Sequence, residues 1–353
     1  MSLAGISSKK QLQIIDYFGS SKNAWAGFSC LDELSEILSK KEIEKIGEIV
    51  NSSKLEDFIF GLQKTGIGWV SIENEKYSSK LKEIFDPPTV LYYRGNINLL
   101  NEDALAIVGT RICSRYGASQ TKIFSKQLSK AGFVIVSGLA EGVDSIAQSE
   151  CVVNGGKTIA VLAGGLNHIY PSININLSKE IVEKGGLLIS ENPPNYVAKS
   201  FNFVQRNRII AGLVLGVFVP EASEKSGSLH TVNFANDNGR HIFALPGPVD
   251  STKSVGTNRL IKNLQGCCVL EPNDIIAEFP QFSLQKKEKR KAVQLDLNEQ
   301  LVLNAIAEEE THFDEIVQKT GLDTKTLNSL LTRMEIRGLI IRLAGNSFSK
   351  KRC

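Results

Sequence analysis

The sequence predicts an α/β protein whose main domain is a Rossmann-like, doubly wound, mostly parallel sheet. A small N-terminal helical domain precedes it and a C-terminal winged-helix-like domain follows it. Three observations predict this arrangement. Short apolar runs alternate with helix-length segments over residues 104–270, apolar residues recur at helical spacing before residue 65, and a charged stretch at 283–291 sets the last part of the chain apart. Nearly continuous apolar strands of this kind indicate a parallel sheet covered by helices on both faces.

Residues 1–65 form the predicted helical domain. Apolar residues recur there every three or four positions, with polar breaks between the groups, which is the spacing of one face of a helix. The groups are Leu12, Ile15 and Phe18, then Leu31, Leu34 and Leu38, then Ile43, Ile46 and Ile49.

The predicted Rossmann-like domain spans residues 66–282. Its first two strands, Trp69–Ile72 and Val90–Tyr93, flank the turn Asp86-Pro87-Pro88. Helices are expected at Tyr116–Ala131 and Gly227–Asn238. The remaining strands are expected at Ala104–Val108, Phe133–Ser137, Thr158–Leu162, Leu187–Ser190, Val214–Val219, His241–Leu245 and Cys267–Leu270.

A charged linker at 283–291 contains the run QKKEKRK, which has no apolar residue. Residues 292–353 then show helix-turn-helix spacing, and the Gly345-Asn346 turn after Leu339–Leu343 resembles the wing of a winged helix. Nine acidic and six basic residues between 292 and 350 give this part a net charge of −3. A phosphate-binding surface would be positive, so the charge favours a protein-contact module.

Composition indicates an ordinary soluble protein. The formal net charge of +3 is too small to indicate a nucleic-acid-binding protein by itself. The longest apolar run, Ile209–Val219, is too short to span a membrane, and the N-terminus has no signal pattern, so a cytoplasmic protein is expected. The cysteines have no metal-binding spacing and are expected to be buried or incidental thiols of a reducing compartment: Cys30, Cys113, Cys151, Cys267, Cys268 and Cys353.

Glycine and hydroxyl residues follow several predicted strands. In a doubly wound sheet, ligands bind beyond the carboxyl ends of the strands, where helices begin. Glycine lets the backbone approach a ligand closely, and a helix N-terminus attracts anions. A single loop of this kind is more typical of a tight turn between strand and helix, but four together favour an anion site. The loops are Gly109-Thr110-Arg111, Ser137–Asp144 with Gly138, Ala163-Gly164-Gly165 and Ser226-Gly227-Ser228.

The segment Arg206-Asn207-Arg208 has two cations close to the start of a predicted helix, directly before the strand Val214–Val219. Cations at a helix N-terminus oppose the helix dipole, so this placement favours a role in anion binding over one in stability. The alternative is that Arg206 and Arg208 are ion-paired surface residues.

Nine motifs, in order across residues 66–280, resemble the DNA-processing protein A family, also called DprA or Smf. Their number and order make the resemblance specific. It also implies that residues 1–65 are similar to the family's sterile-alpha-motif-like domain and that the tail is similar to its winged-helix domain. The motifs are Val108–Arg111, Ser137–Asp144, Tyr170-Pro171 with Asn174, Ser190-Glu191, Arg206–Ile210, Glu221-Ala222, Ser226–Ser228 with Thr231, Pro246-Gly247, and Gly256–Asn258 with Leu260-Ile261.

The resemblance implies a bacterial protein, not an enzyme, that binds single-stranded DNA, protects incoming DNA and loads the RecA recombinase during natural transformation. It implies a role beside single-strand-binding protein, a homodimer formed through the Rossmann-like domain, and no cofactor, metal or catalytic residue. Arg111 matches the arginine of the family's first loop, and Lys199 and Phe203 match the basic and aromatic residues before the RNR motif. The expected nucleic-acid-binding residues are Gly109, Arg111, Ser137, Gly138, Lys199, Phe203, Arg206, Asn207, Arg208, Ser226, Gly227 and Ser228.

Three positions depart from the family's pattern. Glu141 stands where many members have arginine, Gln148 replaces a histidine, and Val204 replaces a proline. Any DNA contact made at the first two positions in relatives would be missing here.

The alternative function is hydrolysis of a nucleotide derivative, because the domain also resembles a superfamily of Rossmann-like phosphoribohydrolases. Those enzymes need a Pro-Gly-Gly-x-Gly-Thr loop followed by a catalytic glutamate. The corresponding segment, Lys225–Thr231 followed by Val232-Asn233-Phe234, has no such acid, so the general base of the hydrolysis would be missing.

Overall fold

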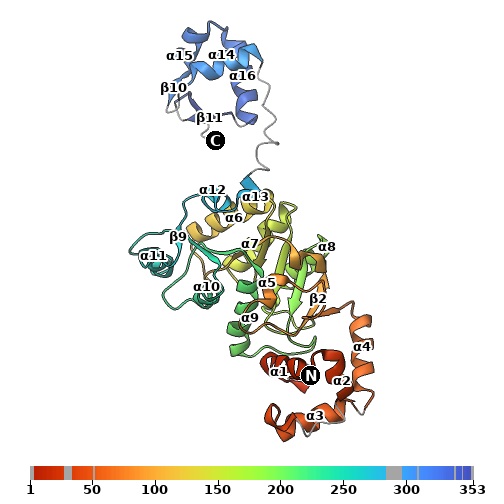
Figure 1. Cartoon of the computed structure of the whole chain (residues 1–353). Coiled ribbons are helices and arrows are strands. Elements are labelled where there is room, and N and C mark those ends of the chain that lie inside the picture. Colours follow the sequence, from red (N-terminus) through yellow and green to blue (C-terminus); the bar gives the residue numbers. More distant parts are fainter. Residues whose placement is uncertain are drawn as a thin grey trace. The chain divides into compact units, whose positions relative to one another are not determined.

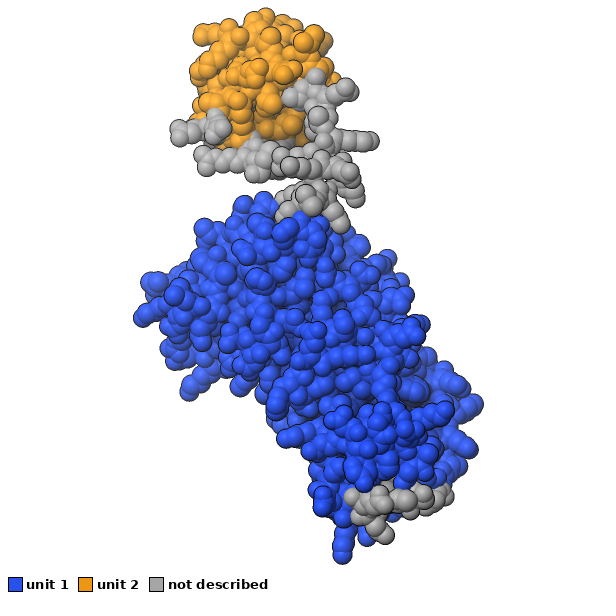
Figure 2. Space-filling view, viewed as in Figure 1, with its two compact units in different colours: residues 1–285 blue, residues 286–353 orange. Residues whose placement is uncertain are grey.

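The computed structural model describes residues 4–27, 34–50, 52–283, 296–307, 310–337, 339–343 and 345–350. Cys30, Cys353 and the charged linker beyond residue 283 lie outside these ranges. The chain divides into two compact units, residues 1–285 and 286–353 (Figure 2). Among the helices that the structure describes, none combines the length and apolarity needed to cross a membrane.

The first four helices are α1 (Ser8–Phe18), α2 (Ser21–Ala26), α3 (Lys40–Val50) and α4 (Lys54–Lys64). Their apolar faces form a small core that includes Ile14, Ala24, Leu34, Leu38 and Ile46. This region packs directly on the sheet edge. The buried Thr89 hydroxyl donates to Gln11 Oε1 at 2.6 Å, and the Phe58 ring meets Tyr92 edge-on at 6.0 Å. The expected boundary near residue 65 therefore separates a helical from an α/β region within one compact unit.

A sheet surrounded by helices forms the centre of the first unit (Figure 1). It has nine strands in the order β1-β2-β6-β5-β4-β3-β7-β8-β9. The strands from β3 onward are parallel, whereas β2 runs antiparallel to both β1 and β6, so the predicted mostly parallel sheet is confirmed. The bounds are β1 (Gly68–Ser71), β2 (Val90–Gly95), β3 (Ala104–Ile107), β4 (Val134–Ser137), β5 (Thr158–Val161), β6 (Leu187–Ser190), β7 (Gly216–Val219), β8 (His241–Ala244) and β9 (Cys267–Cys268).

The last strand differs from the expectation. β9 has two residues instead of four, and both Cys267 and Cys268 are free and exposed, so of the two readings, buried or incidental thiols, they fit the second. β9 is the edge strand and pairs with β8 alone. Because β8 ends at Ala244, opposite Cys268, the paired segment ends there too.

Helices cover both faces of the sheet, as a doubly wound fold requires. Alternation along β3 places Leu105 and Ile107 against α6 and α7, and Ala104 and Ala106 in the core that contains α9 and α10. The helices after β2 are η3 (Ile97–Asn101), α6 (Arg115–Ala131), α7 (Val143–Val153), η4 (Ser172–Asn174), α8 (Ile175–Glu183), α9 (Ser200–Leu213), α10 (Ser228–Asp237), α11 (Val255–Lys262), α12 (Pro272–Ala277) and α13 (Pro280–Ser283), while the short α5 (Ser79–Lys82) packs against α9.

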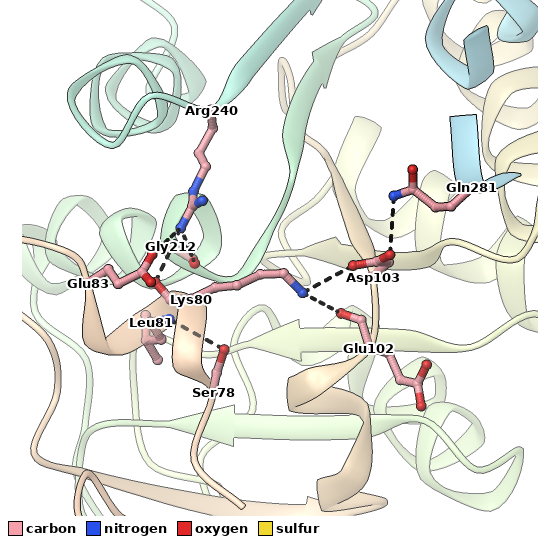
Figure 3. Close-up of polar contacts among 9 residues, drawn as sticks. All are labelled: Ser78, Lys80, Leu81, Glu83, Glu102, Asp103, Gly212, Arg240 and Gln281. Carbon is pink, nitrogen blue, oxygen red and sulfur yellow. Dashed lines mark hydrogen bonds and ion pairs between the residues drawn. The ribbon is translucent and has the colours of Figure 1, made fainter. Parts of the chain in front are cut away.

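The amino ends of β3, β7 and β8 are joined by a polar cluster (Figure 3). Lys80 of α5 donates to Asp103 Oδ1 at 3.3 Å, and Gln281 of α13 donates to Asp103 Oδ2 at 3.3 Å. Arg240 donates to the Lys80 carbonyl at 3.2 Å and to the Gly212 carbonyl at 3.5 Å. These bonds attach α5 and α13 to the beginning of β3.

The winding direction of the sheet changes between β3 and β7. From β3 the chain proceeds to β4, β5 and β6 on one side, whereas from β7 it proceeds to β8 and β9 on the other. The connections that leave β3 and β7 therefore diverge, and a crevice opens between them at the carboxyl ends.

The second unit is a winged helix, as predicted. Its helices are α14 (Leu297–Ala305), α15 (Phe313–Thr320) and α16 (Thr324–Ile336), and its sheet has the order β10-β12-β11, with β10 (Thr311–His312), β11 (Ile340–Leu343) and β12 (Ser347–Lys350). At the C-terminal end of α16, Arg333 pairs with Asp296 at 2.7 Å and with Glu299 at 2.9 Å, and Arg337 pairs with Glu299 at 2.5 Å. Both arginines thus have carboxylate partners within the unit.

Candidate functional site

A cavity of about 580 Å³ lies in the crevice between the loops after β3 and β7. Residues of α9 and the start of α10 complete its wall. The structure brings eight of the twelve predicted residues to this cavity: Gly109, Arg111, Phe203, Arg206, Asn207, Ser226, Gly227 and Ser228.

Arg111 is the exposed cation of the cavity. Its guanidinium carbon lies over the Phe203 ring, 5.7 Å from the centroid, which is a cation–π geometry. Within the described residues it has no carboxylate at ion-pairing distance. Its positive charge is therefore available to a ligand.

Buried polar contacts fix the Arg111 loop. The Thr110 N–H donates to the Glu221 carbonyl at 2.9 Å, and the buried Glu221 carboxylate accepts from the Ser114 N–H at 2.7 Å and from its hydroxyl at 2.6 Å. Gly109 packs so closely that a Cβ there would lie 2.7 Å from the Glu221 carbonyl oxygen. The connections after β3 and β7 are thus held to each other.

The N-terminus of α10 opens on the cavity. Gly227 is its N-cap residue, no side chain caps it, and a Cβ on Gly227 would have nothing within 4 Å. The Ser226 hydroxyl lies 2.8 Å from the Ser228 hydroxyl. The Asn207 amide donates to the Gly227 carbonyl at 3.3 Å and joins α9 to this turn. The positive end of the α10 dipole therefore faces the cavity, which Ser226 and the largely buried Ser228 also line.

Arg206 lines the cavity, but its guanidinium is committed to the protein. The side chain is buried, donates to the Gly138 carbonyl at 2.7 Å and also donates to the Val161 carbonyl. Burial lowers the pKa of Arg206 to about 10, against the opposing charge of Asp144. Burial raises the pKa of Asp144. The charge of Arg206 and the Gly138 N–H, which donates to this carboxylate at 3.0 Å, oppose that shift.

Arg208 does not line the cavity. Its buried guanidinium contacts Glu191 at 2.5 Å and Asp86 at 3.2 Å. The alternative that Arg208 is ion-paired is therefore confirmed, but the pair is buried and not on the surface as that alternative had it. Burial raises the pKa of Glu191, and Arg208 opposes this shift. The expectation that Arg206 and Arg208 lie at a helix N-terminus was wrong. α9 begins at Ser200, where the Asn202 side chain accepts a bond from the Lys199 N–H at 2.9 Å, so both arginines lie in its middle turns.

Three further predicted residues lie outside the cavity lining. The Ser137 hydroxyl is fully buried and donates to the Ile107 carbonyl at 2.7 Å. Gly138 is buried, and a Cβ there would collide with the Arg206 guanidinium. Lys199 is exposed at the start of α9, next to Ser200 of the lining.

The departures at 141 and 148 also lie outside the lining. Glu141 is exposed. Gln148 is fully buried, donates to the Ile159 carbonyl at 3.1 Å and accepts from the Leu139 N–H at 3.1 Å. Its side-chain amide therefore supplies hydrogen-bond partners to backbone groups of β5 and of the loop after β4.

Tyr170 was missing from the expected site residues. It lies in the loop after β5, lines the cavity and meets Phe203 edge-on with 5.6 Å between ring centroids. Its position beyond the carboxyl end of a strand was a usable signal, because that edge forms the site in doubly wound sheets.

The arrangement suits anion binding. An exposed guanidinium, a helix N-terminus and two serine hydroxyls face one cavity. Hydrolysis is not favoured, because the one carboxylate of the lining, Asp144, is buried against Arg206 and accepts a backbone bond.

Comparison with protein families gives two matches. Residues 68–280 match the model of DNA recombination-mediator protein A, and residues 286–346 match the DprA winged helix domain. DNA processing protein DprA of Bacillus subtilis is 37% identical over 259 residues, which cover 73% of this chain and 84% of that protein. Protein Smf of Escherichia coli is 33% identical over 301 residues, covering 82% and 79%.

Solved structures give the same result. DNA processing protein A from Streptococcus pneumoniae superposes with a TM-score of 0.68 at 34% identity, covering 78% of this chain and 94% of that one. DNA processing protein A from Helicobacter pylori, whose structure is described for its single-stranded DNA binding mode, superposes with a TM-score of 0.55 at 32% identity. It covers 60% of this chain and 96% of that one.

Proposed function

The chain belongs to the DNA recombination-mediator protein A family, and on that premise we propose that it binds single-stranded DNA at the cavity between β3 and β7. The observation that carries this proposal is the convergence of the exposed Arg111 and the uncapped N-terminus of α10 on one cavity. Cations and backbone N–H groups are the usual partners of DNA phosphates.

The residues divide into two roles. Arg111, Ser226, Gly227 and Ser228 contact a phosphate directly, and the exposed Lys199 contributes charge at the margin of the site. The others position these groups: Gly109, Ser137, Gly138, Arg206, Asn207 and Arg208 hold the loops and α9 in place.

The cellular role we propose is recombination mediation. The protein protects incoming single strands in the bacterial cytoplasm and loads the RecA recombinase onto them beside single-strand-binding protein, as a homodimer formed by the Rossmann-like domain. Family membership supports this role. It is tested by RecA nucleation on a strand coated with single-strand-binding protein, with and without the full chain; unchanged nucleation would remove RecA loading from the proposal and leave DNA binding standing.

The binding proposal is tested by fluorescence anisotropy with labelled single-stranded and duplex oligonucleotides of equal length, over a salt series. The wild type is expected to favour the single strand and to weaken as salt increases. Arg111→Gln is expected to reduce the slope of log affinity against log salt by about 0.7, the value for one phosphate contact on a single strand.

Lys80→Gln is the matched control. It also removes one positive charge, but at the amino end of β3, where Lys80 already pairs with Asp103. Its salt slope is expected to equal that of the wild type. Equal slopes for Arg111→Gln and Lys80→Gln, or no single-strand binding by the wild type, would contradict the proposed site.

A further inference from the structure

A second cavity, of about 450 Å³, adjoins the first. The two share Tyr170, Ser200 and Phe203 as a common wall. No lysine, arginine, aspartate or glutamate lines the second cavity. Its other members are His168, Ile169, Val197 and Ala198.

The Phe203 ring already contacts protein groups. Arg111 lies over it at 5.7 Å from the centroid, and Tyr170 meets it edge-on at 5.6 Å. A base could use the face under Arg111 only by displacing the guanidinium that we assign to phosphate binding. Stacking and phosphate binding would then compete for one position.

Tyr170 has no such conflict. Its side chain is 60% exposed, and within the described part of the chain its one aromatic contact is Phe203. Val197, on the same cavity wall, is 66% exposed. An exposed aromatic ring beside an uncharged cavity is the type of surface on which bases stack, and every base has a face that can do so.

We infer that the second cavity receives a nucleobase, stacked on Tyr170, from the strand whose phosphate lies at Arg111. Phe203 is then a positioning residue that holds Arg111 over its ring and separates the two subsites. This inference rests on the proposed function and adds to it a division of the site: charge is recognised in the first cavity and base surface in the second.

The division predicts different responses from the two residues. Arg111 acts through charge, so its loss changes the salt slope. Tyr170 acts through stacking, so Tyr170→Ala is expected to weaken binding of an oligothymidine by roughly 5- to 150-fold with an unchanged salt slope. Tyr170→Phe keeps the ring and is expected to bind like the wild type.

The experiment is an anisotropy titration of the full chain with a labelled oligothymidine and with an abasic strand of equal length, which has the same phosphates and no bases. The loss caused by Tyr170→Ala is expected on the oligothymidine and should disappear on the abasic strand. Phe60→Ala removes a comparably exposed aromatic ring from α4, where Phe60 is 68% exposed, and is expected to change neither affinity.

Three outcomes would overturn the inference. An equal loss on both strands would assign Tyr170 a structural role. Unchanged binding by Tyr170→Ala, together with a reduced salt slope for Arg111→Gln, would remove the base subsite while the proposed function stands. Absence of wild-type binding to the oligothymidine would remove both.

Discussion

At the amino ends of β3, β7 and β8 the cations have oxygen partners within the protein, whereas at the carboxyl ends of β3 and β7 Arg111 contacts an aromatic ring. Lys80 and Arg240 bond to Asp103 and to the carbonyls of Lys80 and Gly212 (Figure 3). Arg111, by contrast, has no carboxylate partner in the ranges that the structure describes. The cations at the amino ends thus attach neighbouring elements to the sheet, whereas Arg111 at the carboxyl ends is the cation to which we assign ligand binding in the proposed function.

The cations at the carboxyl ends of the strands also differ among themselves. Arg206 and Arg208 are buried and bonded to the protein, while Arg111 is exposed and lies over Phe203. A basic residue near a binding cavity is therefore not necessarily a ligand contact. Burial and existing partners decide which cations remain available.

The largest expected effect comes from Arg206→Met. It removes the charge opposite the buried Asp144 and the bonds to two carbonyls, so we expect the free energy of unfolding to fall by about 3–5 kcal/mol. Urea unfolding followed by tryptophan fluorescence measures this in the first unit, because both tryptophans, Trp25 and Trp69, lie there. Arg111→Met is the exposed control, expected within about 0.5 kcal/mol of wild type. Equal midpoints for the two variants would contradict the assignment.

Arg208→Met tests the ion-paired arginine. It leaves Glu191 buried without its partner, and we expect a loss of about 2–3 kcal/mol in the same measurement, because the partly exposed Asp86 can turn to water. Adding Glu191→Met removes the unpaired carboxylate, so the double variant should be more stable than Arg208→Met. If the stability loss of the double variant equalled the sum of the losses of Arg208→Met and Glu191→Met alone, the two residues would not be coupled.

Glu221→Gln tests the bond that fixes the Arg111 loop. The amide loses the charge that accepts from the Ser114 N–H and hydroxyl, so we expect a loss of about 1–2 kcal/mol. Glu224→Gln, three residues later, is the control, because Glu224 forms an exposed pair with Arg259 and should cost less than about 0.5 kcal/mol. If Glu224→Gln were the more destabilising variant, the loop would be anchored elsewhere.

The smallest expected effect on stability compares a cation at the amino ends of the strands with one at their carboxyl ends. Lys80→Gln is expected to lower the free energy of unfolding by about 0.5–1 kcal/mol, because its bonds to Asp103 and the Glu102 carbonyl are lost. Arg111→Gln should leave stability unchanged within about 0.5 kcal/mol. Lys80→Gln is thus expected to change stability and not DNA binding, and Arg111→Gln to change DNA binding and not stability. An equal loss of stability for the two variants would contradict the different purposes assigned to these cations.

Much of the fold could be predicted from the sequence because it depends on local periodicity. Buried parallel strands are continuous apolar runs, so β6 was predicted with its observed bounds, and the other central strands were predicted to within two residues at each end. The short β9 was the exception, because its length depends on the lack of a second neighbour, which no local pattern contains.

The candidate site was predictable in place but not in detail. Strand ends and glycine loops located the edge that contains Arg111 and Gly227. The pairing of Arg208 with Asp86 and Glu191, and of Arg206 with the Gly138 carbonyl, depends on contacts between distant segments. A sequence shows which cations are near a site but not which already have partners.

The adjacency of β3 and β7 has a thermodynamic consequence. The walls of the cavity come from connections far apart in the chain, which meet only when the central sheet is formed. A ligand that contacts both walls binds the native state and not the unfolded one, so occupancy must stabilise the sheet by mass action. At a free ligand concentration of 100 times Kd this linkage amounts to about 2.7 kcal/mol. Saturating single-stranded DNA would then raise the unfolding midpoint of the first unit, and the bound strand would help to hold the domain folded.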